Sequence, residues 1–216
     1  MQRSDLAIVI PAYNEELTIQ TVVKAVSVYG KVIVVNDCST DKTPDLAASA
    51  GALVVSHNDN KGYDSALNTG FEKAAQLGLS YAITFDADGQ HNAEIILQYI
   101  ASFDEGNELV LGIRPSTARF AEHIFSLYAN SRLGVKDPLC GMKGYNLNLY
   151  KEHGCFDSYQ SIGTELMFSG LMAGCVMNQI DVPISPRVDA PKFGALFKAN
   201  IKIFRSMLIC IYRYEI

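Results

Sequence analysis

Short apolar runs recur along the first half of the chain, and none of them alternates with polar residues. The first run is Leu6-Ala7-Ile8-Val9-Ile10, and later runs lie at 32–35, 53–55, 81–85 and 109–111. A run of this kind is typical of a strand that helices cover on both faces. The stretches between the runs carry apolar residues at helical spacing. This alternation predicts an α/β fold with a mostly parallel, doubly wound sheet and helices on both faces.

The segments between and after these strands predict the helices. In the first half we expect helices at 15–29, 42–50 and 63–77, and Asn92 is placed to cap another. The sequence of the second half is less regular than that of the first. The strand expected there ends at Pro183, and a loop leads into a short strand. These elements are expected at 117–133, 162–173 and 195–213 for helices, 176–183 for the strand and 137–146 for the loop.

Polar residues follow four of the predicted strands, at the point where each strand ends. Sheets of this type bind ligands beyond the carboxyl ends of their strands, so these polar segments are expected to meet in one crevice. The first segment has neither a G-x-G-x-x-G pattern nor a P-loop, which disfavours a dinucleotide or ATPase site. The four segments are 11–15, 36–41, 86–91 and 112–114.

Asp86 and Asp88 flank Ala87 directly after the apolar run at 81–85. On extended backbone, residues two positions apart point to the same side, so the two carboxylates are neighbours. Neighbouring carboxylates repel each other unless a cation lies between them, and Mg²⁺ or Mn²⁺ prefers oxygen ligands. The pattern predicts a divalent metal site, and the alternative is a solvated turn with two surface aspartates.

Asp37 follows the second predicted strand, where a carboxylate can accept hydrogen bonds from a nucleobase or a ribose. The alternative role for this segment is helix capping, which Ser39, Thr40 and Asp41 can also provide. The two interpretations are compatible, because Ser39 or Asp41 can cap a helix while Asp37 binds the base.

The composition excludes several classes of protein. The 216 residues include 18 basic and 23 acidic ones, a net charge of −5, which disfavours a nucleic-acid-binding protein. Hydrophobic residues make up 49%, so a disordered chain is excluded. No apolar run reaches the roughly 18 residues that span a bilayer. The five cysteines have no C-x-x-C spacing, as expected of reduced thiols in a cytosolic protein.

Four segments form an ordered set of motifs. They are Ile8-Val9-Ile10-Pro11-Ala12-Tyr13-Asn14-Glu15-Glu16, Val34-Val35-Asn36-Asp37-Cys38-Ser39-Thr40-Asp41, Asn60-Lys61-Gly62-Tyr63 with Ala66-Leu67-Asn68-Thr69-Gly70, and Asp86-Ala87-Asp88-Gly89-Gln90-His91. In this order and spacing they strongly resemble glycosyltransferase family 2. Within that family the chain looks most like the dolichyl- and polyprenyl-phosphate mannose or glucose synthases, closely over 6–115 and more loosely over 137–192.

The resemblance implies the GT-A fold and a division of the chain. A single catalytic domain is expected at 1–194, with a nucleotide-sugar half at 1–115 and an acceptor half at 116–194. A C-terminal amphipathic helix is expected at 195–216. The motif positions imply that the nucleotide sugar is bound by Pro11, Ala12, Tyr13, Glu15, Asp37, Lys61, Asp86, Ala87, Asp88, Gln90, Arg114, Arg187 and Lys192.

The implied cofactor is Mg²⁺ or Mn²⁺, held by Asp86, Asp88 and Gln90. The implied catalytic residues are Asp88 and Arg114, and we add Glu165 as a candidate for removing a proton from the acceptor or for positioning it. The implied activity is the inverting transfer of a hexose-type sugar from a UDP- or GDP-linked donor. The expected acceptor is polyprenyl or dolichyl phosphate, an anion that needs no strong base.

Two alternatives stay open for the function. The acceptor can instead be a sugar hydroxyl of a growing cell-surface oligosaccharide (lipopolysaccharide, capsule or glycan), with Glu165 as the base that takes its proton. In that case Glu165 must reach the acceptor; otherwise it is an exposed helix residue. An alternative of another class is a non-catalytic nucleotide-binding subunit. The sugar, the nucleotide base and the oligomeric state stay open.

The end of the chain is basic, whereas the rest is acidic. Residues 187–216 hold six basic and two acidic residues, and residues 1–186 hold 12 basic and 21 acidic ones. A basic amphipathic helix can lie in an anionic membrane interface, so 195–216 predicts a protein that is cytoplasmic or peripheral at the cytoplasmic face. The alternative is a helix that packs on this domain or on a partner subunit. The basic face holds Lys198, Lys202, Arg205 and Arg213, and the apolar face holds Leu196, Ile203, Phe204, Met207, Leu208 and Ile211.

Overall fold

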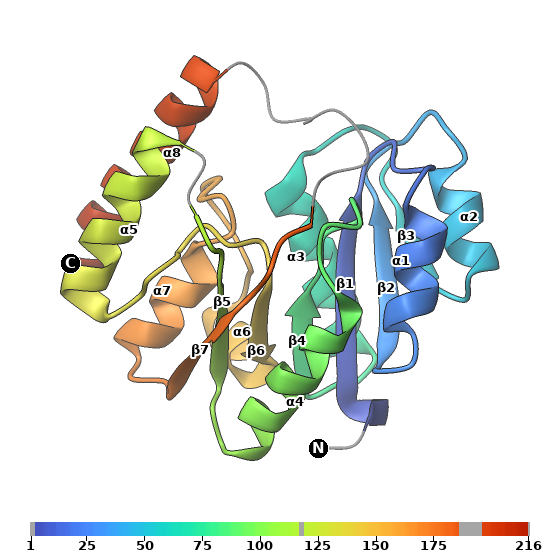
Figure 1. Cartoon of the computed structure of the whole chain (residues 1–216), viewed down its shortest axis with the longest axis horizontal. Coiled ribbons are helices and arrows are strands. Elements are labelled where there is room, and N and C mark those ends of the chain that lie inside the picture. The colour runs from blue at the N-terminus through green and yellow to red at the C-terminus, as the bar shows by residue number, and fades with distance from the viewer. Residues whose placement is uncertain (1–2, 117–118, 186–195, 216) are drawn as a thin grey trace.

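The computed structural model describes residues 3–116, 119–185 and 196–215, which form a seven-stranded sheet between layers of helices (Figure 1). The strand order is β3-β2-β1-β4-β6-β5-β7. Strand β6 is antiparallel to β4 and β5, and the other neighbouring pairs are parallel. The strands are β1 (Leu6–Ala12), β2 (Lys31–Asn36), β3 (Leu53–Ser56), β4 (Tyr81–Thr84), β5 (Leu109–Ile113), β6 (Lys143–Asn146) and β7 (Met177–Asp181).

Two hydrophobic layers cover the sheet, because alternate residues of a strand face opposite sides. In β1, Leu6, Ile8 and Ile10 belong to one core, and Ala7 and Val9 to the other. This arrangement confirms the predicted doubly wound sheet with helices on both faces. The first layer contains α1 (Ile19–Val26), α2 (Thr43–Ser49) and α4 (Ile96–Asp104), and the second contains α3 (Tyr63–Gln76), α5 (Phe120–Leu133), α6 (Leu147–His153), α7 (Glu165–Met172) and α8 (Leu196–Tyr214).

Most predicted elements form close to their expected positions. Asn92 caps as predicted: its Oδ1 accepts a hydrogen bond of 3.0 Å from Glu94 N, at the 3-10 helix η2 (Ala93–Ile95) that leads into α4. Helix α6 was not expected. Helix α7 begins at Glu165, three residues later than predicted, because Gln160, Ile162 and Gly163 have positive φ angles that no α-helix can contain.

Helix α1 begins later than the predicted residue 15. The backbone before it is bound to side chains of the loop that follows β2. Asn14 has a φ of 52°, and its N–H donates to Ser39 Oγ at 3.0 Å. The N–H of Glu15 donates to Thr43 Oγ1 at 2.8 Å. These side chains satisfy the backbone, so the segment forms an ordered loop instead of a helical turn.

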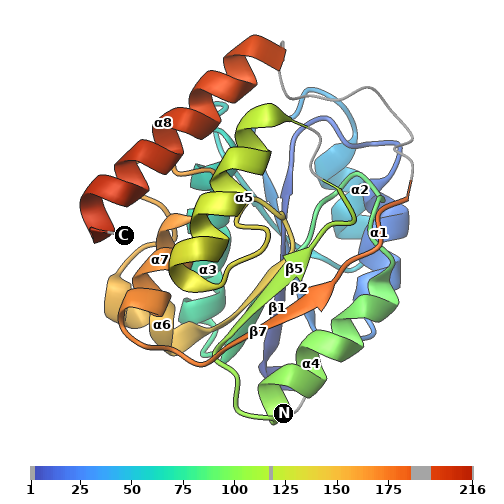
Figure 2. The same ribbon diagram turned by 60° about the vertical axis from the view of Figure 1, so that its left-hand side comes forward.

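Helices α5 and α8 lie side by side at one edge of the molecule (Figure 2). Asn200 Oδ1 accepts a hydrogen bond of 3.1 Å from Ala121 N. Ile203 is buried, and Phe204 and Met207 pack against the same core. Half of the apolar face predicted for the membrane thus packs on the domain, as in the alternative interpretation, whereas Leu208 is exposed. Among the described helices, none is long and apolar enough to cross a membrane.

Candidate functional site

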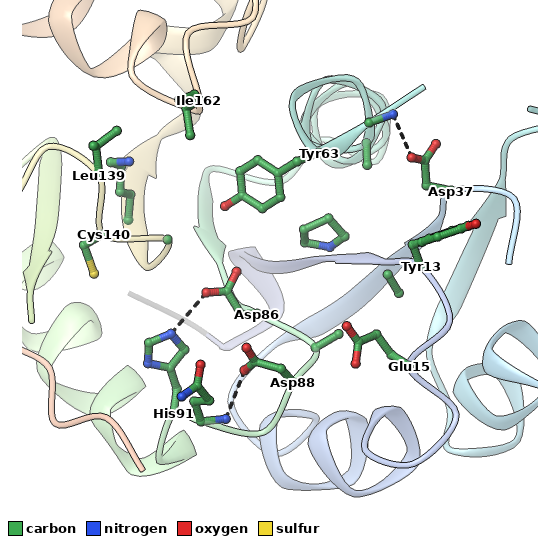
Figure 3. Close-up of a pocket in the computed structure, with 18 of the residues that line it drawn as sticks. Tyr13, Glu15, Asp37, Tyr63, Asp86, Asp88, His91, Leu139, Cys140 and Ile162 are labelled. Atoms are coloured by element: carbon green, nitrogen blue, oxygen red, sulfur yellow. Dashed lines mark hydrogen bonds and ion pairs between the residues drawn. The ribbon is translucent and has the colours of Figure 1, made fainter. Parts of the chain in front are cut away.

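A cavity of about 610 Å³ lies at the carboxyl ends of β1, β2 and β4 (Figure 3). Its size is typical of a small-molecule site. Figure 3 shows Asp86 and Asp88 on one side of the cavity and Leu139 and Ile162 across it, with Tyr63 between them. The sequence-assigned residues that line it are Pro11, Ala12, Tyr13, Glu15, Asp37, Asp86, Ala87, Asp88, Gln90 and Arg114.

The side chains of Lys61 and Glu165 do not join this group. Lys61 contributes its backbone N–H to Asp37, but its exposed side chain is not among those that line the cavity. Glu165 also lies outside the lining. Arg187 and Lys192 lie outside the described residues.

Asp37 organises the side of the cavity next to β2. Its Oδ1 accepts from Lys61 N at 2.9 Å and its Oδ2 from Gly62 N at 2.7 Å. His57 Nδ1 lies 2.7 Å from the same Oδ1, and both side chains are nearly buried. Asp41, not Asp37, binds the start of α2: its Oδ1 accepts from Thr43 N at 2.9 Å. Asp37 therefore fixes the loop at 60–62 against the cavity, where a ligand would meet it.

Asp86 and Asp88 follow β4 and are held by different partners. Asp86 Oδ2 lies 3.3 Å from His91 Nε2, and Asp88 Oδ1 accepts from Gln90 N at 3.1 Å. Burial raises the pKa of Asp86, but the hydrogen bond and charge of His91, with Lys143 and Arg114, hold that pKa below its ordinary value. Asp86 is thus ionised at neutral pH. The alternative of a solvated turn is wrong for Asp88, which is buried.

These residues fit a hard divalent cation. They offer carboxylate oxygens at one wall of the cavity, the ligands that Mg²⁺ and Mn²⁺ prefer. Gln90 Nε2 donates to Ser185 O at 2.9 Å, so the carbonyl end of this amide is the end that can face a cation. His91 Nδ1 is buried without a hydrogen-bond partner among the described residues. Such an orphaned donor or acceptor is uncommon and is typical of a functional site.

Arg114 is a fixed cation in the cavity wall. Its Nε and Nη2 donate to the two oxygens of Asp137 at 2.7 and 2.8 Å. Its Nη2 also lies 3.4 Å from Glu122 Oε2, and Arg119 pairs with the other oxygen of Glu122. Burial lowers the pKa of Arg114, but the hydrogen bonds of Asp137 and the charges of Asp137 and Glu122 raise it by more. The pKa of Arg114 therefore lies above its ordinary value. The sequence predicted Arg114, but not Arg119 and Glu122, which also line the cavity.

Lys143 is a second cation that sequence reasoning missed. It lies in β6, is 3% exposed and lines the cavity. Its Nζ donates to Gly163 O at 3.1 Å, and its N–H donates to Thr84 Oγ1 at 2.9 Å. Burial lowers the pKa of this ammonium, although Cys140, Asp137 and Asp86 oppose that shift. The available signal was a lysine in the segment 137–146, which was predicted to enter a short strand. A lysine is rarely buried in a sheet covered on both faces unless it binds a partner or a ligand.

The wall opposite Asp86 is apolar and comes from the second half of the chain. Leu139 and Ile162 lie there in Figure 3, and Ile203 of α8 also lines the cavity. Ile162 has a φ of 61°, in the left-handed region that β-branched residues avoid. Strain of this kind persists only where the surrounding structure imposes it, and it clusters at ligand sites.

Hydrogen bonds impose this conformation on the loop at 155–164. Asp64 Oδ1 accepts from Gly163 N at 2.8 Å, on the residue next to Ile162. Asp157 Oδ2 accepts from Ser161 N at 2.8 Å. Burial and the neighbouring charge of Asp157 raise the pKa of Asp64 to about 6. With Lys143 on Gly163 O, the loop is bound on both sides of Ile162, so its side chain is held in the cavity wall.

Glu165 is neither exposed nor in the cavity. Its side chain is 1% exposed, and its Oε1 accepts from Ser158 Oγ at 2.7 Å. The same oxygen lies 3.1 Å from His153 Nε2 and 3.7 Å from Arg213 Nη1. The carboxylate thus joins α6, the loop at 155–164 and α8. This placement does not support contact with an acceptor, because the carboxylate is buried in this network and outside the cavity lining.

Comparisons with known proteins show the family and the fold of this chain. The sequence model of Glycosyl transferase family 2 matches residues 7–160. An uncharacterized glycosyltransferase of Mycobacterium tuberculosis is 30% identical over 192 residues, which cover 84% of this chain and 86% of that protein. The UDP-N-acetylglucosamine–dolichyl-phosphate N-acetylglucosaminyltransferase of Methanococcus voltae is 34% identical over 127 residues, or 50% of this chain and 51% of that protein.

A third relative and a solved structure extend the similarity to nearly the whole chain. The dolichyl-phosphate hexose transferase of Haloferax volcanii is 26% identical over 223 residues, 96% of this chain and 94% of that protein. The glucosyl-3-phosphoglycerate synthase of Mycobacterium tuberculosis, solved with Mn²⁺, UDP and phosphoglyceric acid, has a TM-score of 0.76 at 20% identity over 99% of this chain and 79% of that one. That likeness shows a shared fold. The chain spans about half the length of two archaeal relatives that it matches.

Proposed function

Because the chain belongs to glycosyltransferase family 2 and has the GT-A fold, we propose that it transfers a hexose-type sugar from a nucleoside-diphosphate sugar to a lipid phosphate. One observation carries this proposal. A single cavity has carboxylates at one wall, the cations Arg114 and Lys143 beside them, and an apolar wall across from them. The carboxylates can hold a metal ion on the donor diphosphate, and the cations can bind the phosphates of donor and acceptor. The apolar wall can contact the hydrocarbon of a lipid acceptor.

The nucleoside end of the donor is assigned to the side of β1 and β2. Tyr13 and Asp37 line that side, and Tyr13 is 41% exposed. An aromatic ring and a carboxylate can stack on a base and accept from its N–H groups. The Asp37 carboxylate is already bound to Gly62 and Lys61, so it would contact a base through its remaining acceptor capacity.

Asp86 and Asp88 would hold Mg²⁺ or Mn²⁺, with Gln90 beside them. When bound, the cation neutralises charge on the leaving diphosphate. Neighbouring structures of glucosyl-3-phosphoglycerate synthase contain Mn²⁺ or Mg²⁺ with UDP, which supports this choice. Arg114 and Lys143 act on the same charge from the protein side. Both are fixed before the reaction by Asp137 and Gly163, so they need no reorganisation as charge develops.

The acceptor oxygen would attack the anomeric carbon from the face opposite the leaving phosphate, which inverts the configuration there. A lipid phosphate is an anion near neutral pH, so no residue has to remove a proton. The sugar-hydroxyl alternative loses its proposed base, because Glu165 is bound outside the cavity. The apolar wall of Leu139, Ile162 and Ile203 suits the hydrocarbon next to an acceptor phosphate. Relatives named for dolichyl phosphate support this acceptor class.

A peripheral membrane contact through α8 completes the proposal. Ile201, Leu208 and Tyr212 are 52%, 61% and 87% exposed and recur at helical spacing. Lys198 and Lys202 are exposed on the same helix, which contains no acidic residue from Leu196 to Tyr214. An apolar stripe among cations suits an anionic bilayer surface.

The test is release of free nucleotide from a panel of UDP- and GDP-sugars, with Mn²⁺ or Mg²⁺ and with or without polyprenyl phosphate. We expect one donor to release nucleotide in a lipid-dependent and metal-dependent manner. Asp88→Asn should abolish this release, and Asp104→Asn, at the exposed end of α4, should keep it. Full activity of Asp88→Asn would refute the role of this carboxylate, and no release from any donor would refute the activity.

A further inference from the structure

Three side chains that commonly bind metals meet outside the reaction cavity. They are the imidazole of His153 at the end of α6, the thiol of Cys155 in the segment that follows, and the carboxylate of Glu165 at the start of α7. One nitrogen, one sulfur and one oxygen from these residues all lie within 4.8 Å of one another. Nothing in the proposed transfer reaction uses this group.

The spacing of the three atoms suits a single metal ion. Glu165 Oε1 lies 3.1 Å from His153 Nε2 and 3.9 Å from Cys155 Sγ. Bonds of about 2.0–2.3 Å to a tetrahedral ion set neighbouring nitrogen, oxygen and sulfur ligands roughly 3.3–3.6 Å apart. The two distances lie on either side of that range, so small side-chain rotations would bring the three atoms onto one ion.

Ser169 holds the His153 ring from the other side. The hydroxyl oxygen of Ser169 lies 2.9 Å from His153 Nδ1. When Nδ1–H donates to this hydroxyl, Nε2 presents its lone pair to Cys155 and Glu165, as a metal ligand must. Metal-bound histidines almost always have such a partner on their second nitrogen.

A cation can reach this group from the surface. The His153 side chain is 23% exposed and Cys155 is half-buried, although Glu165 is buried behind them. The charged neighbour that an ion must displace is Arg213, whose Nη1 lies 3.7 Å from Glu165 Oε1 and whose side chain is 48% exposed. The Arg213 guanidinium also lies over the ring of Tyr159, 4.4 Å from its centroid. Arg213 therefore keeps a favourable contact when it moves away from the carboxylate.

We propose that His153, Cys155 and Glu165 form a zinc-binding site, separate from the Mg²⁺ or Mn²⁺ site of the reaction cavity. A thiolate, an imidazole and a carboxylate suit Zn²⁺, whereas Mg²⁺ prefers oxygen ligands alone. Binding converts the thiol to a thiolate and releases its proton to solvent, and a water completes four ligands. The ion would join α6, the loop at 155–164 and α7, and so would stabilise the segment that holds Ile162. The site does not depend on the transfer reaction, because its ligands lie outside the cavity lining.

Titration of the reduced full chain with Co²⁺ tests the site directly. Co²⁺ occupies zinc sites and gives a charge-transfer band in the near ultraviolet when a thiolate binds it. We expect this band in the wild type and its loss when equimolar Zn²⁺ is added. Cys155→Ser should abolish the band, and Cys175→Ser, at another half-buried cysteine, should keep it. No band in the wild type, or a band that survives Cys155→Ser, would overturn the site.

Competition with a chromophoric chelator measures the affinity for Zn²⁺. Even the loss of an outer partner of a metal ligand costs about 10–100-fold, so we expect about tenfold weaker binding in Ser169→Ala and a loss of more than about 100-fold in Cys155→Ser. Arg213→Gln should instead strengthen binding about tenfold, because a guanidinium repels a nearby dication. Unchanged or weaker binding in Arg213→Gln would contradict the position of the ion beside Glu165.

Thermal unfolding in excess Mg²⁺ separates the zinc site from the reaction cavity and from misfolding. Zn²⁺ should raise the unfolding temperature of the wild type and of the control His123→Asn, on exposed α5, but not that of His153→Asn. Cys155→Ser, which nearly keeps the size of the side chain, gives the same test if His153→Asn does not fold. An equal zinc-dependent rise in the wild type and in the site variants would place the ion elsewhere and refute the proposal.

Discussion

Ile162 offers a sharp test of how the apolar wall is built. It is half-buried, β-branched and held at a φ of 61°. The left-handed conformation costs a non-glycine residue about 1–2 kcal/mol. Glycine avoids that strain but loses about 0.4–1 kcal/mol relative to alanine through the unfolded chain. The difference predicts that Ile162→Gly is more stable than Ile162→Ala by roughly 1 kcal/mol, the reverse of the usual order.

Urea unfolding of both variants measures this difference, because both remove the same half-buried side chain beyond Cβ. Nucleotide release then measures how much the Ile162 side chain contributes to acceptor binding. The KM for the lipid acceptor should rise in both variants, and the affinity for UDP or GDP should not change. Ile162→Val keeps both the strain and the apolar surface, so its acceptor KM should stay near that of the wild type. An alanine variant at least as stable as the glycine variant would refute the strain, and an unchanged acceptor KM would refute the wall.

Three further perturbations test other parts of the site. Lys143→Met should lower kcat/KM about 10²-fold, the effect of losing one preorganised electrostatic donor, whereas Lys151→Met should leave steady-state rates unchanged. Because the pKa of Asp64 is raised from 3.8 to about 6, the folded protein holds a proton that the unfolded chain releases. The free energy of unfolding should therefore fall as pH rises between these values, and Asp64→Asn should flatten that slope in urea titrations at several pH values. Leu208→Asp should reduce sedimentation with anionic vesicles, with Leu97→Asp on exposed α4 as the control; equal loss in both would argue against α8 as the contact.

The donor side could be predicted because its residues directly follow buried strands. Asp37, Asp86 and Asp88 need only the strand pattern and the rule that parallel strands end at one edge of the sheet. Local sequence therefore determined both the strand and the place of the side chain. The Asn92 cap was predictable for the same reason, since its partner Glu94 N is two residues away.

The acceptor side could not be predicted in the same way, because its residues are placed by contacts between distant segments. Lys143 enters the cavity only because β6 inserts antiparallel between β4 and β5. Ile162 faces it because Asp64 binds the next residue, 99 positions away. Glu165 was proposed as the residue that deprotonates or positions the acceptor, with an exposed helix residue as the alternative, and its long-range partners could not be read from the sequence. Its carboxylate lies 3.1 Å from His153 Nε2, a contact with α6 that the local sequence does not show.

Helix α8 connects the proposed membrane contact to the cavity wall. Ile203 lines the cavity, while Ile201 and Leu208 on the same helix are exposed. At about 1.5 Å of rise per residue, Ile201 and Leu208 lie about 3 Å and about 7.5 Å from Ile203 along the helix axis. Ser206 Oγ donates to Ser161 O at 2.6 Å, next to Ile162. A shift of α8 on a lipid surface would thus move both Ile203 and the loop that holds Ile162. Membrane binding and the shape of the acceptor wall are therefore expected to change together, so anionic vesicles should lower the acceptor KM of the wild type more than that of Leu208→Asp.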